Sequence, residues 1–147
     1  MKFLKSNDKD SYRKVIRKLL EYADTILITC TSDEDLTGTS VYQNLLPESI
    51  EMKVLRKWPG TQSNHQGKLF YFHYNQRVVD EIKLFNCFYR DSIHDYSPID
   101  VAIDMAFLKD GKSVLYSIAH EYEVRVIDNQ LAGELKQMGL NMGKYAR

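Results

Sequence analysis

The stretch Ile99–Asp128, IDVAIDMAFLKDGKSVLYSIAHEYEVRVID, decides the fold. Two runs that alternate apolar and polar residues flank Asp110-Gly111, a dipeptide that tolerates the positive φ angles of a type I′ turn. The stretch therefore predicts a β-hairpin with a two-residue loop, in which Phe107 faces Val114 across the pair of strands.

This register sorts the side chains of the hairpin onto two faces, because successive strand residues point to opposite sides. Met105 is expected opposite Tyr116 on an apolar face, and His120 falls on the same core-facing side. Asp104 belongs to the other face, whose small and acidic residues suit water, a partner or a covering loop. Since the apolar period continues to Val126, the second strand is expected to be long and to bend near residues 119–121.

The rest of the chain supplies further strands and helices. Apolar residues at three- and four-residue spacing predict helices at 11–23, 40–47 and 76–85 and a short last helix after Asp128. Apolar runs predict strands at 25–30, 51–58 and 67–74, with a polar loop at 59–66. Neighbouring strands with interspersed helices indicate the α+β class. We expect a single domain, 1–147, with a mainly antiparallel sheet of about five strands and three to four helices packed on one face.

Composition excludes several classes of protein. The chain has 147 residues and equal numbers of basic and acidic side chains, so its net charge gives no attraction to nucleic acid or to an anionic membrane. No segment approaches the ~20 apolar residues that span a bilayer. The start, MKFLKSNDKDSY, lacks the apolar run of a signal peptide. The two cysteines, Cys30 and Cys87, are far apart in the sequence, which suits a reducing compartment. A cytoplasmic protein without membrane attachment is expected.

The pair His120-Glu121 invites comparison with the zinc-binding motif H-E-x-x-H, but Val124 stands where the second histidine should be. A bend in the strand could still bring acidic and histidine side chains together as acid, base or metal ligands. This alternative hypothesis is a small metal-dependent hydrolase that uses His120, Glu121, Asp104, Asp100 and His94. No catalytic, metal or cofactor motif is complete, so the preferred interpretation contains no catalytic residue, metal or cofactor.

A run of aromatic residues, GKLFYFHY at 67–74, suggests a second alternative. Phe70 and Phe72 would share one face of a strand, as base-stacking aromatics do in some RNA-binding sheets. Without a basic surplus such stacking gives weak, salt-sensitive binding, so nucleic acid is the least favoured partner.

The preferred hypothesis is a non-enzymatic protein-binding module. Aromatic residues and arginine anchor protein interfaces, and acidic loops complement basic partners. The expected partner surface consists of Asp33, Glu34, Asp35, Arg56, Trp58 and His65. We expect such a module to occlude a basic site on its partner, in the manner of an immunity or antitoxin protein or a regulatory inhibitor. An exposed edge strand could also mediate a homodimer.

Overall fold

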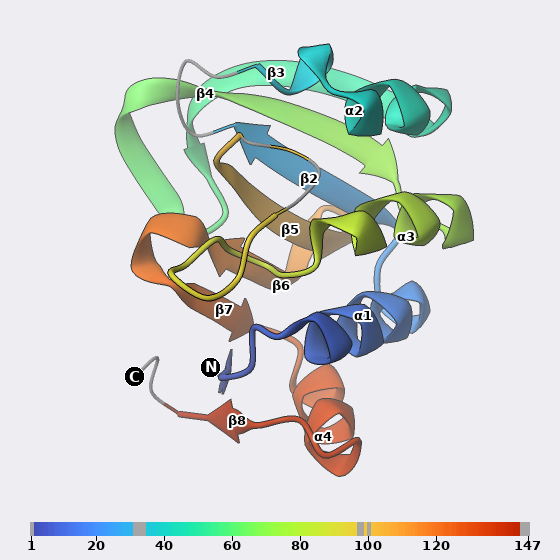
Figure 1. Ribbon diagram of the computed structural model, residues 1–147, viewed down its shortest axis with the longest axis vertical. Helices are drawn as coiled ribbons and strands as arrows, with labels where there is room; N and C mark the ends of the chain where they lie inside the picture. The colour runs from blue at the N-terminus through green and yellow to red at the C-terminus, as the bar shows by residue number, and fades with distance from the viewer. Residues whose placement is uncertain (1, 31–34, 97–98, 100, 145–147) are drawn as a thin grey trace.

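One antiparallel sheet runs through the protein, with the strand order β3-β4-β2-β5-β6-β7-β1-β8 (Figure 1). The computed structural model describes residues 2–30, 35–96, 99 and 101–144. The strands are β1 (Lys2–Leu4), β2 (Thr25–Cys30), β3 (Ser49–Trp58), β4 (Thr61–His73), β5 (Ile103–Lys109), β6 (Lys112–Ile118), β7 (Glu123–Val126) and β8 (Met142–Gly143). The α-helices are α1 (Lys9–Lys18), α2 (Ser40–Leu45), α3 (Gln76–Ile82) and α4 (Asn129–Gln137). Short 3₁₀ turns are η1 (Leu19–Glu21), η2 (Leu36–Gly38), η3 (Leu46–Glu48), η4 (Lys83–Phe85) and η5 (Ala119–Glu121).

The α+β class, the antiparallel sheet and the four helices are confirmed, but the expected number of strands is wrong. The sheet has eight strands instead of about five. Two of the additional strands, β1 and β8, have three and two residues, which is too short for an alternating pattern to show. These strands pair with each other, and β1 also pairs with β7.

The helices cover one face of the sheet and form the main core with it (Figure 1). Helix α1 begins where the Asp8 side chain accepts a hydrogen bond from the backbone N–H of Ser11. Its apolar side chains Tyr12, Val15 and Ile16 are fully buried. Asp128 caps α4 in the same way, as the sequence predicts.

The two-residue loop of the β5–β6 hairpin is confirmed. Asp110 and Gly111 have φ angles of 51° and 79°, as a type I′ turn requires. Beyond the turn the expected register is wrong, because the pairing shifts at a β-bulge and Phe107 lies opposite Leu115 instead of Val114. The carbonyl oxygen of Val114 instead accepts hydrogen bonds from the backbone N–H groups of Ile127 and Asp128.

The bulge moves the later residues of β6 to the other face of the sheet. Tyr116 now lies opposite Ala106, so it shares a face with Asp104 and not with Met105. The chain also reverses at η5 instead of bending, and β7 returns antiparallel to β6. His120 therefore does not face the core: it lies on η5 with its side chain 64% exposed.

The tip of the β3–β4 hairpin, at the left of Figure 1, lies over part of the second face of the sheet. The expected loop at 59–66 is wrong, since only Pro59 and Gly60 form the turn and β4 begins at Thr61. A Cβ added to Gly60 would lie 2.6 Å from the ring of Tyr116, so the tip rests directly on β6. A second apolar cluster forms beneath it, composed of Leu27, Trp58, Leu69, Ala106, Leu108, Tyr116 and Ile118.

Within the described part of the chain, none of the helices has both the length and the apolar character needed to cross a membrane.

Candidate functional site

Asp104 joins three segments beneath the tip of the hairpin. Its side chain is buried, and Oδ2 accepts a hydrogen bond of 2.9 Å from the indole Nε1 of Trp58. Oδ1 accepts a bond of 2.8 Å from the backbone N–H of Ala119 at the start of η5. Burial raises the pKa of Asp104 above its ordinary value, because a charged carboxylate loses hydration there. Both oxygens are thus engaged in holding the fold together.

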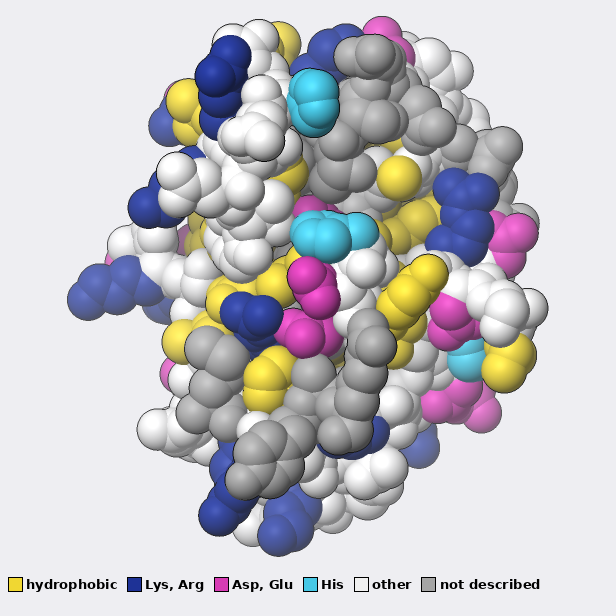
Figure 2. All heavy atoms as spheres, turned by 90° about the vertical axis from the view of Figure 1, so that its left-hand side faces the viewer, with side chains coloured by type: hydrophobic (Ala, Val, Ile, Leu, Met, Phe, Trp, Pro, Cys, Tyr) yellow, Lys and Arg dark blue, Asp and Glu magenta, His cyan; other side chains and the backbone are white. Residues whose placement is uncertain are grey.

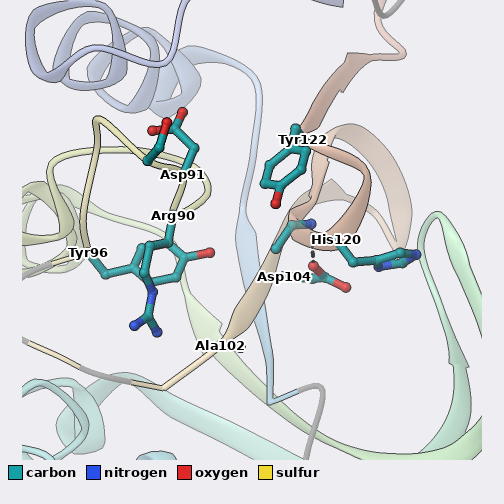
Figure 3. Close-up of a pocket in the computed structure, with 9 residues that line it drawn as sticks. Arg90, Asp91, Tyr96, Ala102, Asp104, His120 and Tyr122 are labelled. Carbon is teal, nitrogen blue, oxygen red and sulfur yellow. Dashed lines mark hydrogen bonds between the residues drawn. The ribbon is translucent and has the colours of Figure 1, made fainter.

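A cavity of about 430 Å³ lies beside this carboxylate (Figure 3). It is lined by Arg90, Asp91, Ser92, Tyr96, Ala102, Asp104, Ala119, His120 and Tyr122. Tyr96 and Tyr122 face each other across the space, whereas the ring of His120 points away from it. The Tyr96 hydroxyl donates a hydrogen bond of 3.0 Å to the carbonyl oxygen of Ile103, which fixes the ring. Asp91 and Asp104 also bind groups outside the lining, since Asp91 accepts a hydrogen bond from the backbone N–H of His94 and Asp104 accepts one from Trp58.

The residues of the alternative hydrolase hypothesis are only partly brought together. Asp104 and His120 line the same cavity, and His120 Nε2 lies 3.6 Å from Glu121 Oε1. His94 is not part of this lining, but its ring nitrogen Nδ1 lies 3.2 Å from Oδ2 of Asp91, which is. Asp100 lies outside the described residues. The described part of the chain contains no cluster of three or more histidine, cysteine or acidic side chains that could hold a metal ion.

The structure describes four of the six residues of the expected partner surface. Asp33 and Glu34 lie outside the described residues, and Asp35 is exposed as the cap of η2. Arg56 on β3 and His65 on β4 are exposed. Trp58 is only 6% exposed and points into the second apolar cluster, so its indole is not available to a partner.

Figure 2 shows the side of the molecule that carries the tip of the β3–β4 hairpin. Basic, acidic and hydrophobic side chains are interspersed there among those that the structure describes.

The two phenylalanines of the aromatic run on β4 do not offer a stacking platform. Phe70 and Phe72 are buried in the main core, at 4% and 1% exposure, and Leu69 is buried in the second cluster. Strands β3 and β2 flank β4 on both sides. Bases could not reach the two phenylalanine rings without unfolding the core.

Among the described residues, exposed apolar side chains gather on a strand that the sequence did not single out as a binding surface. Strand β3 forms an edge of the sheet, and all its residues except Trp58 are exposed. The exposed fractions are 45% for Ile50, 53% for Met52, 45% for Val54 and 43% for Leu55. The alternation of apolar and charged residues at 50–54 indicates a strand with one buried face, and only the position of that strand in the sheet leaves the apolar side chains in water.

A cleft of about 480 Å³ adjoins this edge on the face away from the helices. Its floor contains the apolar side chains of Leu27, Leu69 and Leu108. Lys53 and Lys57 of β3 contribute to its lining. A chain lying along β3 could therefore place a side chain in this cleft.

No family of known proteins, no curated protein and no solved structure matches this chain.

Proposed function

We propose that the protein is a non-enzymatic binding module that acts by occlusion, pairing its edge strand β3 with an extended segment of another protein chain. The observation that carries this proposal is the exposed apolar edge. Of the nine large hydrophobic side chains that are exposed among the described residues, five fall between Leu46 and Leu55. Such clustering on a monomer is typical of an interaction surface.

Strand addition explains how this surface gains both affinity and selectivity. The outer side of an edge strand presents backbone N–H and C=O groups that a partner strand can pair with. Met52 and Val54 would then be covered by the partner's side chains, and the adjoining cleft would accept one of them. The segment of the partner that is bound in this way is no longer accessible to other molecules. Immunity proteins and inhibitors act by blocking a surface of their partner in this manner.

The experiment is an affinity capture that uses the whole protein as bait and compares matched variants. Met52→Arg places a charge in the exposed edge and is expected to abolish capture of a stoichiometric partner. Ile93→Arg is the control, because Ile93 is 84% exposed but lies outside the sheet. Equal capture by the wild type and both variants would exclude the β3 edge.

Salt distinguishes this mechanism from the acidic-loop surface that the sequence suggests. Strand pairing rests on backbone hydrogen bonds and apolar contacts, so capture is expected to persist at about 0.5 M salt, where exposed charge pairs are largely screened. Two results together would instead favour the acidic loop. The wild type would lose capture at that salt concentration, and Asp35→Lys would reduce capture as much as Met52→Arg does.

A further inference from the structure

We infer that a second copy of this chain occupies the β3 edge, in an antiparallel pair centred on Met52. This inference rests on the proposed function, because both use the same strand. The resulting symmetric dimer would be the resting state of the protein, and another partner would have to displace the second copy.

The pairing of β3 with β4 fixes those faces. Met52 lies opposite Phe70, which belongs to the main core on the helix side of the sheet. Lys53 lies opposite Leu69, which belongs to the second cluster on the other side. Glu51 lies opposite Tyr71 and so shares a face with Lys53.

A two-fold pair centred on Met52 is self-complementary. Residues equally distant from the centre lie opposite each other in an antiparallel pair, so Glu51 of each copy faces Lys53 of the other. Met52 faces Met52 of the second copy on the helix side. Two attractive charge pairs and one apolar contact form together, and the helices of both copies remain on the same side of one continuous sheet.

Neighbouring registers lose this complementarity. Centring the pair on Lys53 places lysine opposite lysine, and centring it on Glu51 places glutamate opposite glutamate. A shift of the centre by half a residue places Met52 opposite Glu51. The helices of the two copies would then lie on opposite faces of the joined sheet.

The opposite end of the sheet also favours a closed dimer. The edge strand there, β8, has two residues, whereas β3 has ten. Joining β3 of one copy to β8 of the next would form few hydrogen bonds, so open-ended assembly is disfavoured relative to a symmetric β3–β3 pair.

The test is a charge exchange followed by sedimentation equilibrium over a range of concentrations. Lys53→Glu and Glu51→Lys each place like charges opposite each other. Each variant alone is expected to dimerise about tenfold more weakly or worse, because two symmetric pairs change from attraction to repulsion. An equimolar mixture of the two variants is expected to form heterodimers, and the double variant Glu51→Lys/Lys53→Glu is expected to regain the wild-type association.

Lys112→Glu is the control, since it makes the same change of charge at an exposed position of β6. It should leave the dimer intact. Because all three positions are exposed, circular dichroism is expected to show folded variants. If the single variants fail to associate and their equimolar mixture also fails, the register centred on Met52 is wrong.

A wild type that stays monomeric up to about 100 μM, a concentration at which even a weak specific pair is populated, would overturn self-pairing. The capture experiment then separates the two proposals. A monomer that still captures a protein in a Met52-dependent manner contradicts only the dimer, whereas a monomer with no Met52-dependent partner contradicts the proposed function as well.

Discussion

The indole nitrogen of Trp58 lies 2.9 Å from Oδ2 of Asp104, a buried hydrogen bond between residues 46 positions apart. It connects the tip of the β3–β4 hairpin to the central strand β5. The second oxygen of Asp104 holds η5 through Ala119. One buried carboxylate thus fixes the hairpin over the sheet and the chain reversal that precedes β7.

Replacing Trp58 with phenylalanine keeps an aromatic ring but removes the donor to Asp104. The free energy of unfolding is expected to fall by about 1–3 kcal/mol, because a buried carboxylate oxygen loses its partner. Urea unfolding followed by circular dichroism measures this loss. Tyr71→Phe is the control, as Tyr71 is a partly buried ring that packs on the same cluster. Equal losses in both variants would mean that the hydrogen bond contributes nothing specific.

The ionisation of Asp104 predicts a dependence of stability on pH. Because burial raises its pKa above 3.8, ionisation costs more in the folded protein than in the unfolded chain. Asp104 therefore makes its full contribution to the free energy of unfolding below about pH 3.8, and this contribution is lost as pH rises through the pKa of the folded state. The wild type is therefore expected to lose stability relative to the Asp104→Asn variant as pH rises from about 3 to 7. Urea unfolding of both proteins at each pH gives the difference in their free energies of unfolding.

Asp35 supplies a control of opposite sign. Hydrogen bonds from the side chain and backbone of Thr37 lower the pKa of Asp35, so its contribution is present above pH 3.8 and is lost as pH falls through the folded pKa. The wild type is therefore expected to gain stability relative to the Asp35→Asn variant as pH rises. Parallel trends for the two variants would contradict the assignment for Asp104.

The contact of the hairpin tip with β6 predicts unequal costs for two glycine substitutions. Gly60 and Gly111 both have positive φ angles, of 83° and 79°. Only Gly60 has atoms of Tyr116 and Ile118 within 3 Å of an added Cβ, while nothing lies within 4 Å at Gly111. Thermal unfolding should show that Gly60→Ala is about 1–3 kcal/mol more destabilising than Gly111→Ala, because overpacking adds to the backbone strain. Equal costs would mean that the tip does not press on β6.

Asn7 is expected to be the main support of the segment that lines the cavity. Its Oδ1 accepts a hydrogen bond of 2.9 Å from the N–H of Phe88, and its Nδ2 donates one of 2.8 Å to the carbonyl of Tyr89. Asn7→Ala should reduce the free energy of unfolding by about 1–3 kcal/mol, since a buried N–H loses its acceptor. Asn44→Ala removes only an exposed bond to Glu81 and should have little effect in the same urea titration. Similar losses would argue against a specific role for Asn7.

Local features of the fold follow from the sequence because short-range chemistry determines them. Asp110-Gly111 specifies its turn through the backbone conformations that these residues tolerate. The register beyond that turn could not be predicted, since the bulge at Val114 depends on backbone donors at Ile127 and Asp128. Those donors reach Val114 only after β7 has folded back.

The candidate site shows the same division. Trp58 suggests an exposed anchor beside a loop, but a two-residue turn folds it inward against Asp104. The apolar residues Met52 and Val54 suggest a buried strand face, but their strand lies at the edge of the sheet. Neither the closure of the hairpin nor the order of the strands is encoded in a local pattern, so the exposed edge becomes visible only in three dimensions.

The position of β1 between β7 and β8 has a consequence for the order of folding. Lys2 pairs with Val126, and Leu4 pairs with Met142, so β1 must wait for partners that are synthesised more than a hundred residues later. Strands β2 to β6 can pair while the chain is still emerging from the ribosome, since their partners lie closer in sequence. The pairing of β1 closes the longest loops and is therefore expected to be among the last events. Until then, β7 presents a second open edge, and the nascent protein is briefly exposed to mispairing at both ends of its sheet.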